Sequence, residues 1–201
     1  MSKNSRQIPN KREFISDKDY CDLLYAWLQC NSERLGPNEQ GRYVPKSEVV
    51  FSRIEKDFTD SEGNKVMNRK TISKYFNWLL EQELVIYNEK ERRYELKVLE
   101  ANCASLIEYK TLSTLMNVLK RHSISIYVYL YNRYYANKGE YVITIKQIKD
   151  MIGIATSTTS NNIIVSDTLN ILKRLQLLDY AIVYENEKTI IHVKWVKNEL
   201  P

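Results

Sequence analysis

Five polar side chains in residues 68–82 have the types and the spacing that contact with duplex DNA requires: Arg69, Lys70, Ser73, Lys74 and Asn77. Side chains spaced by three or four residues lie on one face of an α-helix, so we expect these five to project together. Guanidinium and ammonium groups suit phosphates and the O6 and N7 atoms of guanine, and a carboxamide suits adenine. This pattern predicts a helix face that reads double-stranded DNA.

The apolar residues of the same segment predict the helix that positions those side chains. They recur with a 3.6-residue period at Ile72, Tyr75, Phe76, Leu79 and Leu80. The next residues, "LVIYNEKERRYELKV", alternate as two short strands around a polar tip, which indicates a β-hairpin. The tip adds three cations that we expect to meet phosphates: Lys90, Arg92 and Arg93.

The plan of a helix followed by a hairpin recurs in the second half, as "VSDTLNILKRLQLLDYAIVYENEKTIIHVKWV". Each copy follows an apolar helix, a Tyr-Val dipeptide (Tyr43-Val44 or Tyr141-Val142) and a second short helix. Helix, short strand, helix, helix, hairpin is the order of a winged helix, which places a helix in the major groove of DNA. We therefore expect an α+β, mainly helical fold of two tandem winged helix-turn-helix domains, each with a small β-hairpin wing.

These elements divide the chain into a flexible basic arm at residues 1–15, a first domain at 16–99 and a second at 105–197. One segment, "SISIYVYLYNRYYA", fits both the alternation of a strand and one face of a helix. The helix is favoured because the matching segment of the first half, "CDLLYAWLQC", has helical periodicity.

The second copy offers uncharged hydrogen-bonding groups in place of cations. Its turn and early helix carry five candidates for DNA contact: Thr158, Thr159, Ser160, Asn162 and Ser166. Its hairpin tip is acidic, and we expect Ile163 to point outward. Contact with DNA, dimerisation and packing between the domains therefore all stay open for this half, and a homodimer through it is one expectation.

Other residue types argue against catalysis, cofactors and membranes. The chain has 201 residues and a net charge of +5, with three cysteines that lack CxxC spacing and two histidines, so no zinc site can be assembled. The pair Tyr134-Tyr135 suggests the nucleophile of a DNA-nicking enzyme, but that chemistry needs a metal held by clustered histidines. Phosphate-binding glycine loops, GxSxG and HExxH are absent from the sequence. We expect a cytoplasmic protein without catalytic residues, metal, cofactor, small-molecule substrate or membrane segment.

A resemblance to a known family adds a biological role. The segment "YKTLSTLMNVLKRHSISIYVYLYNRYYANKGEYVITIKQIKDMIG" followed by "NILKRLQLLDY" resembles the winged-helix domains of plasmid and phage replication initiators of low-GC Gram-positive bacteria. In the first half, "LLYAWL" and "WLLEQELVI" resemble the same sequence elements of that family. The inserted "DSEGNK" and the missing glycine of the family's "GLI" element depart from its pattern.

The resemblance implies an origin-binding protein of a plasmid or mobile element. A transcriptional repressor or activator would make the same contacts with different DNA. In a third interpretation, both halves bind protein partners instead of DNA.

Overall fold

The computed structural model describes residues 5–9, 20–36, 41–59, 63–99, 104–185 and 188–201. The α-helices are α1 (Cys21–Cys30), α2 (Phe51–Asp57), α3 (Arg69–Glu81), α4 (Tyr109–Val118), α5 (Ser123–Ala136), α6 (Ile145–Ile152) and α7 (Thr159–Arg174). The strands are β1 (Ser5–Pro9), β2 (Glu33–Arg34), β3 (Arg42–Pro45), β4 (Val85–Asn88), β5 (Arg93–Leu96), β6 (Ala104–Glu108), β7 (Tyr141–Thr144), β8 (Leu178–Glu185) and β9 (Lys188–Val196), with a short 3₁₀ helix at Lys46–Glu48.

The strands form three small antiparallel sheets. One pairs β1 with β6, a second has the order β2-β3-β5-β4, and a third has the order β7-β9-β8. In the first sheet, Ser5 lies opposite Glu108 and Ile8 opposite Ser105, so the beginning of the chain is joined to its middle.

The expected fold class, two tandem winged helix-turn-helix domains with one hairpin wing each, is therefore wrong. Within the described ranges, the chain forms seven α-helices and three sheets, and the β1–β6 sheet belongs to neither repeat. Residues 5–9, expected in a flexible arm, form β1, where Arg6 and Ile8 are buried. Residues 33–34 add a fourth strand to the second sheet. Strand pairing over such separations leaves no local periodicity, which is why the sequence did not indicate it.

Several individual elements are confirmed. The ambiguous segment is a helix, α5, in which eight consecutive residues, 123–130, are buried. The helix expected at 68–82 is α3, and the side chain of Asn68 caps its N-terminus by accepting a hydrogen bond from the Thr71 backbone at 2.9 Å. Both predicted hairpins form, as β4–β5 and β8–β9.

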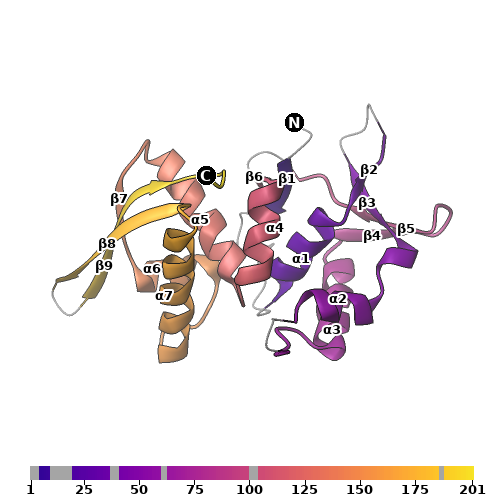
Figure 1. The fold of residues 1–201 in the computed structure, drawn as a ribbon, viewed down its shortest axis with the longest axis horizontal. Helices are drawn as coiled ribbons and strands as arrows, with labels where there is room; N and C mark the ends of the chain where they lie inside the picture. The colour runs from indigo at the N-terminus through magenta and orange to yellow at the C-terminus, as the bar shows by residue number, and fades with distance from the viewer. Residues whose placement is uncertain (1–4, 10–19, 37–40, 60–62, 100–103, 186–187) are drawn as a thin grey trace.

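Helix α1 lies at the centre of the molecule, where it packs against α3, α4 and α5. Eight of its ten residues are buried, as expected of a helix surrounded by protein on all sides. Figure 1 shows the elements of the first half on the right, those from β7 onward on the left, and α1, α4, β1 and β6 between them.

One carboxylate links α1 to α5 across this centre. Asp22, in the first turn of α1, accepts hydrogen bonds from the backbone N–H and the hydroxyl of Ser125, at 3.0 and 3.1 Å. Ser125 is buried in the first turn of α5, where a carboxylate is also favoured by the helix dipole. This contact joins the first half of the chain to the second.

Candidate nucleic-acid interface

Helix α3 has one buried face and one polar face. Ile72, Tyr75, Phe76 and Leu79 are buried, and aromatic contacts extend their packing, with Phe76 lying edge-on to Phe51 and Tyr94. On the other face Lys70, Lys74 and Asn77 are exposed, spaced by four and three residues, and Ser73 is half-buried beside them. No acidic residue occurs from 64 to 80, so this face presents an acid-free positive surface to solvent.

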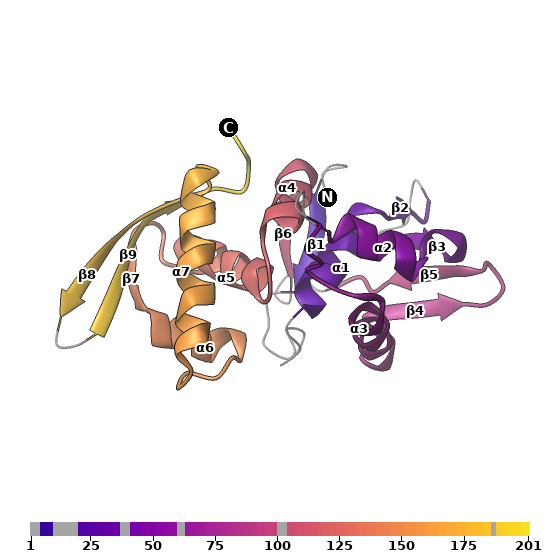
Figure 2. The same cartoon turned by 60° about the horizontal axis from the view of Figure 1, so that its bottom comes forward.

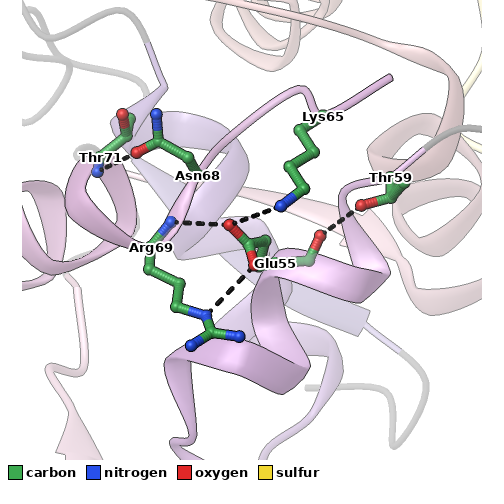
Figure 3. A network of polar contacts seen from close by, with 6 residues as sticks. All are labelled: Glu55, Thr59, Lys65, Asn68, Arg69 and Thr71. Atoms are coloured by element: carbon green, nitrogen blue, oxygen red, sulfur yellow. Dashed lines mark hydrogen bonds and ion pairs between the residues drawn. The ribbon is translucent and has the colours of Figure 1, made fainter. Parts of the chain in front are cut away.

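A single carboxylate fixes the start of this helix. Glu55 of α2 is 8% exposed; its Oε1 accepts a hydrogen bond from the backbone N–H of Arg69 at 3.1 Å, and its Oε2 lies 3.2 Å from the Arg69 Nε. The Nζ of Lys65 approaches Oε1 at 3.3 Å. Figure 3 shows Glu55 between Lys65 and Arg69, with the Asn68–Thr71 cap beside them. The carboxylate thus ties α2 to the N-terminus of α3 and to the segment that leads into it.

The same contacts set the charge of Glu55. Burial raises the pKa of Glu55, but the hydrogen bond from the Arg69 backbone and the pairing with Lys65 and Arg69 outweigh this effect and hold that pKa below its ordinary value. Glu55 is therefore ionised at neutral pH, where a negative charge at a helix N-terminus is favourable.

Arg69 is consequently a positioning residue as well as a surface cation. Its side chain is 66% exposed, but its Nε is engaged by Glu55. Of the five residues predicted on α3, the structure gathers Lys70, Ser73, Lys74 and Asn77 on the polar face and holds Arg69 at its beginning.

The three cations predicted at the first hairpin tip differ from one another. Lys90 and Arg92 are exposed, and Arg92 has a φ of 51°, in the left-handed region. Arg93 instead lies 2.9 Å from Glu95 and stacks its guanidinium over the ring of Tyr43 at 4.8 Å. Lys90 and Arg92 are thus the tip cations open to a ligand, whereas Arg93 holds the sheet together.

The residues predicted in the second half surround the start of α7. Thr159 and Ser160 are exposed in its first turn and Ser166 is half-buried further along. The hydroxyl of Thr158 lies 3.2 Å from the Ala155 carbonyl. The Oδ1 of Asn162 accepts a hydrogen bond at 2.7 Å from the Nζ of Lys149, which is 3% exposed and also bonds the Thr156 carbonyl. The side-chain oxygen of Asn162 is therefore occupied by the buried Lys149 ammonium group.

The sequence interpretation missed Glu55 and Lys65 as parts of this site. Helical periodicity gives no signal for Glu55, because it lies directly after the buried Ile54 rather than three or four residues from it. Its partner lies fourteen residues further along, beyond the reach of helical periodicity.

The described residues offer neither a metal-binding cluster nor a membrane-spanning helix. They contain no cluster of three or more histidine, cysteine, aspartate or glutamate side chains that could hold a metal ion. No helix among them combines the length and the apolar character needed to cross a bilayer. Tyr134 and Tyr135, considered above as a nucleophile pair, pack edge to face with ring centroids 5.4 Å apart.

Comparison with known proteins gives little further information. The chain matches no protein-family model and no curated protein. Two solved structures from Saccharomyces cerevisiae align with most of it. The Stn1 C-terminal structure is 10% identical over 87% of this chain and 94% of that chain, with a TM-score of 0.26. The telomere capping protein Stn1 is 11% identical over 90% and 99%, also with a TM-score of 0.26. At such scores the likeness carries no argument about fold or function.

We predict that Glu55→Gln destabilises the protein in a pH-dependent way. Because the folded pKa of Glu55 is lowered, its ionised carboxylate stabilises the fold above its ordinary pKa of 4.5, and this contribution is lost as the pH falls through the lowered value. Urea unfolding at pH 7 should give a lower midpoint for Glu55→Gln than for the natural protein. The two midpoints should converge when the pH is brought well below 4.5.

The matched control is Glu81→Gln, at the exposed end of α3. It should behave like the natural protein, because exposed substitutions away from such contacts change stability by less than about 0.5 kcal/mol. Equal midpoints for Glu55→Gln and the natural protein at pH 7 would show that Glu55 does not hold α3 in place.

Proposed function

We propose that this protein binds double-stranded DNA with the polar face of α3 in the major groove. The observation that carries the proposal is the exposed, acid-free face formed by Lys70, Lys74 and Asn77 on a helix fixed by Glu55. The major groove is about 12 Å wide and admits an α-helix. Ammonium groups attract phosphates and guanine, and the Asn77 carboxamide matches the N6 and N7 atoms of adenine.

Glu55 also influences which part of α3 meets the DNA. Helix N-termini commonly bind phosphate through free N–H groups and the helix dipole. In α3 the N–H of Arg69 is bonded to Glu55 and that of Thr71 to Asn68. The exposed side chains of α3, rather than the backbone N–H groups of its first turn, are therefore proposed to contact the DNA.

The proposed function is binding without catalysis. The finer role, origin binding by a replication initiator of a plasmid or mobile element, is supported by the sequence resemblance alone. In vitro selection of bound sites from random duplex DNA tests it. A repeated site that maps to an origin supports replication initiation, and one that maps to a promoter supports transcriptional control; the symmetry of the site reports whether two copies bind together.

We predict that Lys70→Ala with Lys74→Ala weakens DNA binding by removing two phosphate-neutralising charges. Each lost contact should reduce the slope of log affinity against log salt by about 0.9, so the pair should lower it by about 1.8. Fluorescence anisotropy with labelled duplex, repeated from low to high salt, measures both affinity and slope.

Lys110→Ala with Lys197→Ala removes the same charge from the start of α4 and the residue after β9, away from α3. This control should keep the natural slope. If the α3 pair and the control pair give equal slopes, α3 is not the DNA-binding element.

We predict that substitutions of Arg92 and Arg93 have different effects, on DNA affinity and on stability respectively. Arg92→Asn with Lys90→Ala removes exposed charge, and asparagine tolerates the positive φ of position 92. This variant should bind all duplex sequences more weakly by the same factor, because phosphate contacts carry no sequence information. Anisotropy against several duplexes measures the effect.

Arg93→Ala should act mainly on stability, because it removes the Glu95 ion pair and the stacking on Tyr43. We expect a loss of about 1 kcal/mol in urea unfolding, within the range of exposed cation–π contacts. A tip variant that loses affinity for one sequence only would instead make the tip a reader of bases.

A further inference from the structure

A groove with a volume of about 750 Å³ lies between the two halves of the chain. One wall is the face of α7 between Ser160 and Arg174. The other wall is formed by residues 64–66, which lead into α3, and by residues 118–123, which connect α4 to α5. In Figure 1, α3 and α7 both reach the lower side of the molecule, and Figure 2 turns this side forward with the central elements between them.

The charges that line this groove favour an anionic occupant. Four cationic side chains line it, Lys65, Lys120, Arg121 and Arg174, against one carboxylate, Asp167. Lys120 and Arg174 are exposed, and within the described part of the chain neither makes an ion pair. A recess that carries one sign of charge concentrates ligands of the opposite sign.

These cations continue onto the face of α3. Lys65 lines the groove and pairs with Glu55, and the same carboxylate holds Arg69 at the first residue of α3. Lys70 and Lys74 follow along the exposed face of the helix. Cations therefore occur on α7, in the groove wall and along α3, and Glu55 neutralises part of the charge of Lys65 and Arg69 between them.

The groove also suits the neutral parts of a nucleic-acid strand. Ile163 is 57% exposed and Val118 is 41% exposed along it, so apolar surface is available to sugar rings. The exposed hydroxyl of Ser160 can donate a hydrogen bond to a phosphate oxygen. Thr168 and Ser123 line opposite walls of the groove, and the Thr168 hydroxyl donates a hydrogen bond to the Ser123 hydroxyl at 2.9 Å.

We propose that this groove binds the sugar-phosphate backbone of the same duplex that α3 contacts, so that the protein covers a longer stretch of DNA than one helix can. The proposal rests on the DNA binding proposed for α3. A polyanion is favoured over an acidic peptide because further exposed cations, Lys70 and Lys74, lie on α3 beyond the groove, and a long ligand could reach both sets. The groove would add phosphate contacts and affinity, whereas sequence recognition stays with α3.

The test measures affinity against duplex length with mixed-sequence duplexes of about 10 to 30 base pairs, spanning one to three helical turns. Affinity of the natural protein should rise with length until both α3 and the groove are occupied. Lys120→Ala with Arg174→Ala should bind the shortest duplex normally and lose about tenfold on the longest, with a salt slope lower by about 1.8. Lys110→Ala with Lys197→Ala is the charge-matched control and should follow the natural curve.

A second variant is expected to increase affinity, a result that misfolding of the variant could not produce. Asp167→Asn removes the one carboxylate that lines the groove and should strengthen binding of the long duplex several-fold, with the short duplex unchanged. Unchanged affinity of both groove variants at every length, with the Lys70/Lys74 variant still impaired, would overturn the groove assignment and leave the groove for a protein partner. Absence of salt-dependent binding in the natural protein would instead overturn the proposed function itself.

Discussion

The Glu55 carboxylate is the contact on which the proposed interface depends. It accepts a hydrogen bond from the first residue of α3, pairs with the Arg69 side chain and with Lys65, and thereby joins α2, α3 and the wall of the groove. A partly buried acid is stable in its ionised form only because these donors compensate for lost hydration. Glu55 therefore helps to position the start of α3, and the buried face of the helix, with Phe76 packed on Phe51 and Tyr94, holds its body.

The central helices give the same rigidity to the relation between α3 and α7. Helix α1 packs against α3 on one side and α4 and α5 on the other, and the hydrogen bonds from Ser125 to Asp22 fix its angle to α5. Pairing of β1 with β6 adds a second connection between the first and second halves of the chain. Because contacts within the protein hold both walls of the groove, binding of a DNA strand would cost little conformational entropy in the protein.

Local features of this molecule could be predicted from the sequence, and its long-range contacts could not. The 3.6-residue period of α3 indicated the four residues that it buries, with Leu80 of the same stripe only half-buried, and alternation around a polar tip indicated both hairpins. The pairing of β1 with β6 joins residues about a hundred positions apart, which local periodicity cannot indicate. For this reason the predicted fold class of two winged-helix domains was wrong. The polar face of α3 was likewise accessible to prediction, whereas the engagement of Arg69 by Glu55 and of Asn162 by Lys149 required the structure.

Lysine accessibility in the presence and absence of duplex DNA would show directly where the ligand binds, and it requires no amino-acid substitution. The protein would be acetylated briefly under each condition, and the modification of each lysine read by mass spectrometry. Duplex DNA should protect Lys70 and Lys74 strongly, while Lys110, at the start of α4, should react equally in both samples. Saturating duplex that leaves Lys70 and Lys74 as reactive as in the free protein would contradict DNA binding through α3.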